Sequence, residues 1–587
     1  MKTRPVRSTF LLLVSSTLLL TGCTPRPLLH SAEGGRRYAI STQGEAASRA
    51  ADEVLREGGN LFDAAIAASF VISVERPHST GIGGGGFWLS YDARTQKLIA
   101  LDFRERAPAK IRLPGALLKK DPQAVTTLLQ DTPLGAGVPG FIAGMAEVHR
   151  RFGRLPWARL VRPAIELAER GFTIYPDLAD ALADRRDVLA KDPDASRIFL
   201  HSDGSPYRLG ETLVQKDLGT TLRTIAGAGA DAFYRGEIAD KISSWMRSRK
   251  APLVASDLRS YRVIERKPVV VDALDHKIAV MPPPSSGGIL LPQMLRLLET
   301  ERGRLREWGP GDERSLHRVA QAMQLAFADR ARFLGDPDFT PIPQQALLSR
   351  EYLAQRRSLS FGERALPAAS VTPLSREKWR ALQSRFRESS DTTHLSLLDD
   401  EGNAIATTQS INGWMGSGQV VAGTGILLNN TNDDFSIGEG VKNLYGAIGS
   451  KPNRLAPKKT PLSSMTPTIV FGPSGSDRPT MAIGSPGGTR IITCVLQTLL
   501  NRWIHGLPLA ESIARPRIHQ QWMPDELLVE DPAPHEGFSK SVTDALATRG
   551  HPVKRDEVHC RVLAVERGGT EFRAATDPRD AGLAIVR

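Results

Sequence analysis

The chain has 587 residues, of which 41% are apolar and 24% are charged. These values are ordinary for a globular protein and exclude collagen-like, coiled-coil and wholly disordered chains. The formal net charge is +12, but the basic residues are spread along the chain with Asp and Glu nearby. A solvated basic surface therefore explains the charge better than nucleic-acid binding, and no nucleic-acid partner is predicted.

The first 22 residues have the composition of a secretory signal. Three basic residues precede an apolar run at 10–20, which is shorter than the ~20 residues of a membrane-spanning helix. Leu20-Thr21-Gly22-Cys23 resembles a bacterial lipobox, in which the signal peptide (1–22) is removed and Cys23 is lipidated. A plain signal peptide is the alternative. With Thr24 after the cysteine, the lipobox favours an anchor on the periplasmic face of the outer membrane.

The part of the chain before residue 363 is a mixture of helix and strand patterns. Residues 23–36 are predicted to be a lipidated tether, followed by a helix at 46–56 and a nearly all-apolar, buried helix at 61–74. A glycine-rich turn at 81–86 leads into an aromatic strand at 87–91, and further helices are expected at 157–170 and 316–333.

A second part begins after a polar stretch at 363–391 that is predicted to be an exposed linker. Alternating residues predict strands at 392–398, 404–411, 425–428, 468–471 and 480–484, and then a helix at 491–503. The mixture indicates an α/β or α+β fold with a boundary near residue 391.

Three familiar motifs are incomplete in this sequence. Gly81-x-Gly83-x-x-Gly86 matches a dinucleotide fingerprint, but no strand pattern precedes it and no helix follows it, so a close-packed glycine turn is the better interpretation. Ser485 lacks the first glycine of the nucleophile elbow. No metal or other cofactor is predicted, because no His or Cys lies at ligand spacing, and His78 and His394 are interpreted as core residues.

The cysteine count excludes a disulfide framework. Cys494 and Cys560 are the two cysteines beyond the lipobox, and they can pair although nothing in their spacing requires it.

Thr392 lies where the polar linker meets a predicted strand. A threonine hydroxyl becomes an effective nucleophile when a free α-amine on the same residue acts as its base. That amine has a pKa of about 7.7–8.0, so it can accept and return a proton near neutral pH. Because an internal threonine has no such amine, the chain must be cut between Asp391 and Thr392, in an accessible segment before a rigid strand.

Downstream segments carry the other groups that an acyl-transfer site needs. Gly487 and Gly488 precede the predicted helix, where adjacent N–H groups can hold an oxyanion; a plain turn is the alternative. Ser463, Ser464 and Asp434 lie in loops between short strands, where hydroxyls and a carboxylate can bind a zwitterionic amino acid. Asx-turns are the alternative for each of them.

From Tyr38 to the C-terminus the chain resembles the gamma-glutamyltranspeptidase family of N-terminal-nucleophile hydrolases. A series of ordered motifs carries this resemblance: Gly83-Gly84-Gly85-Gly86-Phe87, Asp102-Phe103-Arg104-Glu105, Gly137-Val138-Pro139-Gly140, Pro283-Pro284-Ser285-Ser286-Gly287-Gly288, Thr392-Thr393-His394, Leu428-Asn429-Asn430, Asp433-Asp434-Phe435-Ser436, Pro461-Leu462-Ser463-Ser464-Met465 and Gly484-Ser485-Pro486-Gly487-Gly488.

The resemblance implies a precursor that cuts itself into a large subunit (37–391 after the tether) and a small catalytic subunit (392–587), which form a heterodimer. The implied fold is a four-layer αββα sandwich built from two interleaved subunits. Thr392 would take the acyl group of a gamma-glutamyl donor such as glutathione and pass it to water or an amino acid.

The resemblance also implies roles for individual residues. Thr392 is the nucleophile and base, Ser410 supports it in place of a threonine, and Gly487 and Gly488 hold the oxyanion. The implied substrate-binding residues are Arg104, Ser463 and Ser464 for the donor carboxylate, Asn412 and Asp434 for its ammonium, and Tyr445 on a lid loop.

One position departs from the family pattern. Thr431 follows Asn429-Asn430, where the family usually has a longer amide or carboxylate that contacts the donor ammonium. A lost charge-assisted contact costs about 1.5–3 kcal/mol. Two alternatives to a gamma-glutamyl enzyme are therefore a glutaryl amidase of the cephalosporin-acylase type and a catalytically idle lipoprotein that uses the fold for binding.

Overall fold

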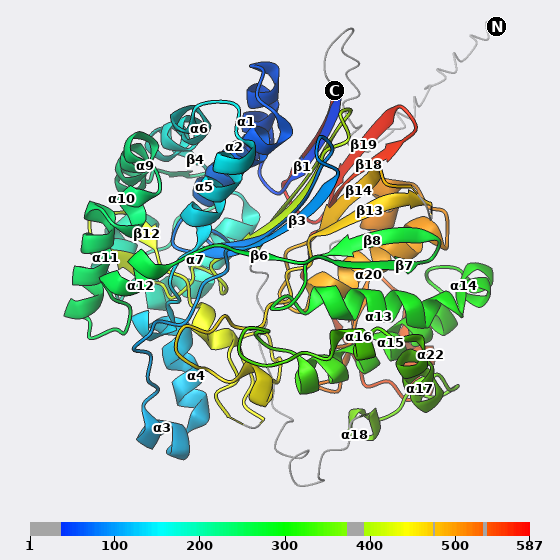
Figure 1. Cartoon of the computed structure of the whole chain (residues 1–587). Coiled ribbons are helices and arrows are strands. Elements are labelled where there is room, and N and C mark those ends of the chain that lie inside the picture. The colour runs from blue at the N-terminus through cyan, green and yellow to red at the C-terminus, as the bar shows by residue number, and fades with distance from the viewer. Residues whose placement is uncertain (1–36, 372–391, 439, 474–475, 532–536) are drawn as a thin grey trace, which may run out of the picture.

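Two antiparallel sheets form the centre of the molecule (Figure 1). The computed structural model describes residues 37–371, 392–438, 440–473, 476–531 and 537–587. The seven-stranded sheet has the order β20 (Leu583–Val586), β1 (Tyr38–Thr42), β9 (Thr393–Asp399), β10 (Ala404–Ser410), β2 (Gly85–Asp92), β3 (Lys97–Asp102) and β6 (Ile264–Arg266). The six-stranded sheet has the order β19 (Glu571–Thr576), β18 (Leu563–Gly568), β14 (Pro479–Gly484), β13 (Thr468–Pro473), β8 (His276–Val280) and β7 (Val269–Ala273).

Alternation of side chains along the strands creates the layers. Ile40 and Trp88 face the helices outside the seven-stranded sheet, whereas their neighbours Ala39, Phe87 and Leu89 face the other sheet. The inner strands β9, β10 and β2 of the seven-stranded sheet are buried on both sides, whereas β7 at the edge of the other sheet exposes one side. The result is the predicted αββα sandwich, with one hydrophobic layer between the sheets and one outside each of them.

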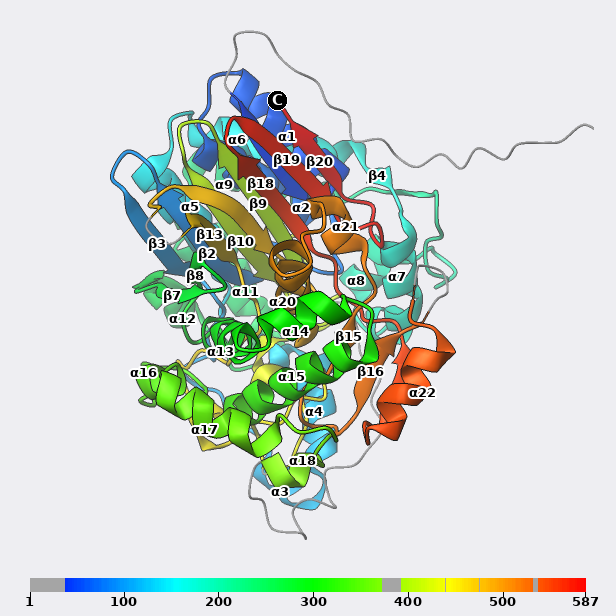
Figure 2. The same ribbon diagram turned by 90° about the vertical axis from the view of Figure 1, so that its right-hand side faces the viewer.

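Each sheet carries its own helices. Those packed on the seven-stranded sheet are α1 (Glu45–Arg56), α2 (Leu61–Glu75), α5 (Phe141–Phe152), α6 (Trp157–Arg170), α9 (Lys216–Ala228), α10 (Asp231–Tyr234), α11 (Glu237–Ser248) and α12 (Ala255–Ser260). Those on the six-stranded sheet, most of which lie below the strands in Figure 2, are α13 (Gly287–Glu299), α14 (Arg302–Trp308), α15 (Glu313–Phe333), α16 (Gln344–Leu347), α17 (Arg350–Ser360), α18 (Ala368–Val371), α20 (Arg490–Trp503), α21 (Leu509–Ala514) and α22 (Lys540–Thr548).

Smaller elements complete the described chain. They are α3 (Gly115–Lys120), α4 (Pro122–Asp131), α7 (Pro176–Leu189), α8 (Pro193–Phe199), the pair β4 (Phe172–Thr173) and β5 (Thr212–Leu213), the pair β11 (Val420–Val421) and β12 (Ile426–Leu427), and the sheet of β15 (Ile518–His519), β16 (Leu527–Glu530) and β17 (Val553–Asp556). Every helix in the described ranges is too short or too polar to cross a bilayer.

The predicted elements are confirmed to within a few residues. Helix α2 is buried along its whole length, as its all-apolar pattern predicts, and α6 covers the predicted range. The glycine turn is confirmed as a close backbone approach. A Cβ on Gly83 would lie 2.1 Å from the Leu427 carbonyl oxygen, and one on Gly84 would lie 2.2 Å from that of Ser410.

Segments from before and after residue 391 contribute to both sheets and alternate in the seven-stranded one. In the seven-stranded sheet, β1 lies between β20 and β9, and β10 pairs with β2. Of the stretch expected to be an exposed linker, residues 363–371 are described; Ala368 and Val371 are buried in the core, whereas 372–391 lie outside the described residues. The signal peptide, the tether with Cys23, and Asp391 lie outside them as well.

Candidate active site

Thr392 directly precedes β9, in the middle of the seven-stranded sheet, and is only 3% exposed. The antiparallel register pairs Thr393 with Gln409, so Thr392 lies opposite Ser410 at the end of β10. Ser410 Oγ accepts a hydrogen bond from the Asn412 N–H at 2.8 Å. The sheet therefore fixes the backbone of the predicted nucleophile and its predicted supporting hydroxyl side by side.

A cavity of about 330 Å³, including its open mouth, lies beside Thr392. Its walls come from both parts of the chain, which the sheets bring together. The lining residues are Arg104, Arg330, Thr392, Ser410, Asn412, Asp434, Asn443, Tyr445, Leu462, Ser463, Ser464, Met465, Gly488, Thr489 and Ile491. The structure thus brings together all the predicted site residues within its described ranges except Gly487, which adjoins Gly488, and Thr431.

Two glycines stand at the end of the cavity where α20 begins. Gly487 and Gly488 have φ angles of 125° and 56°, which favour glycine. Within the described part of the chain, neither N–H group donates a hydrogen bond. Such N–H groups at a helix N-terminus favour an anion, so this backbone can stabilise a tetrahedral oxyanion formed at Thr392.

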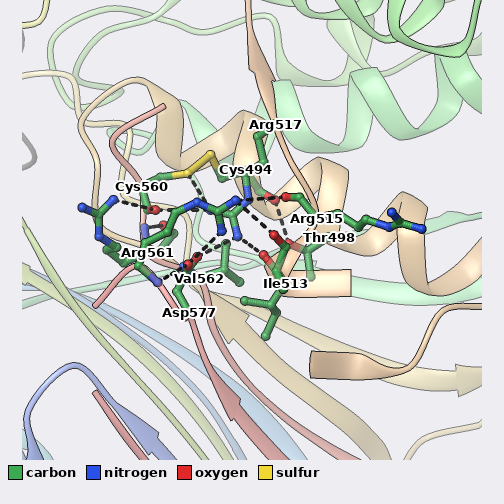
Figure 3. Close-up of polar contacts among 12 residues, drawn as sticks. Cys494, Thr498, Ile513, Arg515, Arg517, Cys560, Arg561, Val562 and Asp577 are labelled. Atoms are coloured by element: carbon green, nitrogen blue, oxygen red, sulfur yellow. Dashed lines mark hydrogen bonds and ion pairs between the residues drawn. A yellow bond between two sulfur atoms is a disulfide. The ribbon is translucent and has the colours of Figure 1, made fainter. Parts of the chain in front are cut away.

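A disulfide lies behind this glycine loop. Cys494 in α20 is bonded to Cys560, with 6.7 Å between the Cα atoms. A Cβ on Gly487 would lie 2.9 Å from the Cβ of Cys560, so the loop packs directly on the disulfide. Figure 3 shows the buried Arg517 beside it, donating to the Cys560 carbonyl oxygen at 3.2 Å and pairing with Asp577 at 2.6 Å.

Ser463 and Ser464 are positioned by the Pro-Pro-Ser-Ser loop that precedes α13. The Ser463 N–H donates to the Pro284 carbonyl oxygen at 2.8 Å, and its carbonyl oxygen accepts from the N–H and Oγ of Ser286. Ser285 Oγ donates to the Met465 carbonyl oxygen at 2.7 Å. This motif, whose role the sequence analysis leaves open, holds the two serines against the cavity.

Arg104 and Asp434 both line the cavity and form an ion pair with each other. Arg104 also donates to the Pro461 carbonyl oxygen at 3.2 Å, and Asn443 Nδ2 donates to Asp434 at 2.8 Å. Burial raises the pKa of the Asp434 carboxyl, and the guanidinium groups of Arg104 and Arg330 oppose that rise. One cation and one anion of the cavity thus neutralise each other.

The two other residues predicted to contact an ammonium differ in position. Asn412 lines the cavity with its Nδ2 donating to the Asn430 carbonyl oxygen at 3.3 Å, which leaves its amide oxygen as an acceptor. Thr431 is 1% exposed and does not line the cavity. Its hydroxyl donates instead to Glu105 at 3.0 Å, and burial raises the pKa of that carboxyl to about 7.

Tyr445 closes one side of the cavity. Its hydroxyl donates to the Asn412 carbonyl oxygen at 3.0 Å, and its own carbonyl oxygen accepts from Gln521 Nε2 at 3.1 Å. A Cβ on Gly488 would lie 2.3 Å from the Tyr445 ring. Gln521 also accepts a hydrogen bond from Thr489, so the loop with Tyr445 is tied to the start of α20.

Arg330, Asn443 and Thr489 line the cavity but are not among the residues predicted from the sequence. Arg330 follows Met323 by seven residues and Phe327 by three, so it falls on the apolar face of its helix. A charged residue at a buried helical position is a signal that could have marked it. Asn443 and Thr489 carry no comparable signal, because their contacts depend on how loops meet.

The two histidines interpreted as core residues are buried. His394 is hydrogen-bonded through its ring nitrogens to Thr408 at 2.8 Å and Ser396 at 2.9 Å, and burial lowers its pKa to about 3. Burial likewise lowers the pKa of His78. In the described ranges, no three His, Cys, Asp or Glu side chains are grouped as metal ligands would be.

The chain is similar to known proteins over nearly its whole length. The family model for gamma-glutamyltranspeptidase matches residues 47–586. A glutathione hydrolase proenzyme of Escherichia coli (strain K12) is 37% identical over 529 residues, covering 90% of this chain and 88% of that protein. An acylase ACY 1 proenzyme of Pseudomonas sp. (strain SE83) is 33% identical over 528 residues, covering 89% and 88%. The crystal structure of cephalosporin acylase from Bacillus halodurans aligns with a TM-score of 0.78 at 26% identity, covering 96% of this chain and 98% of that one.

Proposed function

Because the chain belongs to the gamma-glutamyltranspeptidase family, we propose that it is a self-processing gamma-glutamyl hydrolase and transferase whose nucleophile is Thr392. The observation that carries this proposal is the cavity, in which Thr392 lies with Gly488, Ser463, Ser464 and Arg104. The chain keeps the residues that the chemistry needs, which argues against the catalytically idle alternative.

The first step is maturation of the precursor. The Thr392 hydroxyl attacks the carbonyl carbon of Asp391, and the C–N bond of the peptide breaks, so that its nitrogen takes the hydroxyl proton and becomes the α-amine of Thr392. Hydrolysis of the resulting ester then restores the Thr392 hydroxyl and leaves a carboxylate on Asp391. The products are the large subunit ending at Asp391 and the small subunit 392–587, which remain together as a heterodimer. The interleaved sheets support this, since each subunit supplies strands to both sheets.

The second step is acyl transfer. The α-amine of Thr392 takes the hydroxyl proton while the oxygen attacks the gamma-amide of the donor, and the N–H groups of Gly487 and Gly488 hold the oxyanion. The amine then gives the proton to the leaving nitrogen as the carbon–nitrogen bond breaks. Water or an amino acid attacks the acyl-enzyme and restores the hydroxyl. Ser410 supports the nucleophile from the neighbouring strand.

The charged residues of the cavity suit a glutathione-like donor. We assign the donor carboxylate to Arg104, Ser463 and Ser464, and the ammonium to Asp434 and Asn412. The ion pair between Arg104 and Asp434 favours a zwitterion, which can contact both partners without leaving either charge unpaired. Tyr445 covers the bound donor.

Glutaryl amidase activity is a second candidate, favoured by one observation. Thr431 binds Glu105 and does not reach the cavity, so one family contact to the ammonium is missing. The acylase relatives add weight to this candidate. A glutaryl group has the carboxylate of a gamma-glutamyl group but no amine.

The experiment compares the wild-type protein with Thr392→Ala. We expect two wild-type fragments, the smaller beginning at Thr392, and an uncut Thr392→Ala chain; intact mass reports both. Rates with gamma-glutamyl and glutaryl anilides then separate the two candidates. An uncut wild-type chain would contradict the proposed nucleophile, and a preference for the glutaryl anilide would favour the second candidate.

We also propose that the protein is an exported lipoprotein held at the periplasmic face of the outer membrane through Cys23. The lipobox supports this, and the disulfide between Cys494 and Cys560 suits an oxidising compartment. We expect Cys23→Ala to move the protein from the membrane fraction to the soluble periplasmic fraction. Membrane retention of that variant would argue against the anchor.

A further inference from the structure

Arg330 lies on α15 and lines the same cavity as Thr392, yet the roles proposed above do not use it. It is only 6% exposed. Its Nε donates to Ser286 Oγ at 3.2 Å and its Nη2 to Ser464 Oγ at 3.4 Å, and both partners are uncharged. Across the described ranges of the chain, no carboxylate lies within ion-pair distance of its guanidinium.

A buried charge without a counter-ion is costly. Arg104 offsets that cost by pairing with Asp434, whereas the partners of Arg330 within the described ranges are hydroxyl groups. Burial lowers the pKa of Arg330 to about 10; Asp434 opposes that shift from a distance, and the nearby charge of Arg104 adds to it. At neutral pH the guanidinium is still protonated, so the cavity holds one cation in a direct ion pair and one for which the described residues provide no direct ion pair.

We infer that Arg330 is a specificity-determining residue of the donor site, where its guanidinium and the Ser464 hydroxyl together bind the carboxylate of the acyl donor. An incoming carboxylate gives Arg330 a direct counter-ion, which the described residues do not supply. A guanidinium donates to a carboxylate more strongly than a hydroxyl does, so it discriminates against donors that lack this anion. The inference rests on the proposed function and adds Arg330 to the residues that recognise the donor carboxylate.

Three anilide substrates isolate the carboxylate from the amine. The gamma-glutamyl anilide has both groups, the glutaryl anilide lacks the amine, and the 4-aminobutyryl anilide lacks the carboxylate. Each is assayed with the wild type, with Arg330→Met and with Arg332→Met. Arg332 is a matched control, because it lies two residues further along the same helix and is exposed.

We expect Arg330→Met to lower kcat/KM about 10- to 100-fold for both substrates that carry the carboxylate. The 4-aminobutyryl anilide should change by less than about threefold, since it makes no contact with Arg330. Arg330→Lys, which keeps a charge but loses the planar fork, should recover part of the loss. Arg332→Met should resemble the wild type on all three substrates.

Equal losses on the three substrates would overturn the inference, because they would mean that Arg330 only holds the loops of Ser286 and Ser464 in place. Failure of both Arg330 variants to accumulate as cleaved protein would overturn it as well. The wild-type rates test the proposed function separately. If the wild type prefers the glutaryl anilide, the proposed function fails while the effect of Arg330 on the two carboxylate substrates is still measured.

Discussion

Gly488 is constrained both by its backbone conformation and by a neighbouring side chain. The backbone φ is 56°, and a Cβ would meet the Tyr445 ring at 2.3 Å. The same residue supplies one of the two N–H groups assigned to the oxyanion. A side chain here would strain the backbone, displace the ring and turn the N–H group away from the developing charge.

We therefore expect Gly488→Ala to lower kcat by about 100-fold or more, the usual effect of losing an oxyanion donor. Steady-state rates on the gamma-glutamyl anilide and the extent of self-cleavage would measure it. Gly506→Ala is the matched control, since Gly506 has a φ of 70° but open space where its Cβ would lie. Equal effects of the two changes would mean that backbone strain alone is responsible.

Among the elements, the loop with Tyr445 is tied down at several points. Asp433 accepts a hydrogen bond from the Leu444 N–H at 2.7 Å, and Asp434 accepts one from Asn443. The Tyr445 hydroxyl adds the bond to the Asn412 carbonyl oxygen. Asp434 and Asn412 line the cavity, so two of these contacts tie the loop directly to the wall of the donor site.

Tyr445→Phe removes only the hydroxyl bond. A neutral hydrogen bond contributes about 0.5–1.5 kcal/mol, so we expect KM for the gamma-glutamyl donor to rise about 2- to 12-fold with little change in kcat. Tyr207→Phe, at a partly buried tyrosine outside the cavity, serves as the control. A fall in kcat at unchanged KM would show that Tyr445 acts on the chemical step instead.

The disulfide joins α20 to the segment before β18 and supports the glycine loop. Removing a disulfide costs roughly 2–4 kcal/mol. We expect the double variant Cys494→Ser, Cys560→Ser to unfold at a lower temperature and to turn over more slowly, because the segment at Cys560 on which Gly487 packs is no longer bonded to α20. Thermal scans with and without reductant would measure this, and reductant should affect only the wild type. An unchanged kcat would mean that the loop is held by other contacts.

A buried histidine pair joins α15 to the segment after α22. His317 Nδ1 and His551 Nε2 lie 2.7 Å apart, and His317 Nε2 lies 2.9 Å from the Gly362 carbonyl oxygen. Burial lowers the pKa of His551 to about 3, and the pKa of His317 is lowered for the same reason. In the unfolded chain, histidine side chains take up protons near pH 6.5. The contribution of this pair to the free energy of unfolding is therefore complete above that pH and declines as the pH falls toward 3.

His551→Gln keeps a hydrogen-bonding side chain at this position and removes its titrating imidazole. Between neutral pH and pH 5, the free energy of unfolding of the wild type should fall by about 1–2 kcal/mol more than that of the variant. Urea unfolding at the two pH values would measure the difference. His201→Gln, at a partly exposed histidine, should show no comparable effect. An equal loss of unfolding free energy between the two pH values in the wild type and in His551→Gln would contradict the role assigned to this histidine.

At the scale of the whole molecule, the fold was predictable and several contacts of the site were not. Periodicity predicted the strands and helices because each pattern is local, as in α2 and β9. The predicted residues of the cavity lie in motifs that resemble the family. The pairing of Arg104 with Asp434, the turn of Thr431 toward Glu105 and the position of Arg330 depend on contacts between segments far apart in sequence. A local pattern can place Arg330 on the buried face of its helix, but it does not encode these contacts.

The interleaved sheets have a genetic consequence. Under the proposed cleavage, the two subunits are already assembled when the chain is cut, because they fold as one chain and share the hydrophobic layer between the sheets. Two defective gene copies should therefore fail to complement each other, even when one carries Arg104→Met and the other Thr392→Ala. Co-expression that recovered no gamma-glutamyl activity would agree with this, whereas recovered activity would mean that halves from different chains had assembled. A defect in one gene copy therefore affects only the protein made from that copy. Because both subunits come from one translated chain, they are made in equal amounts whatever their affinity for each other.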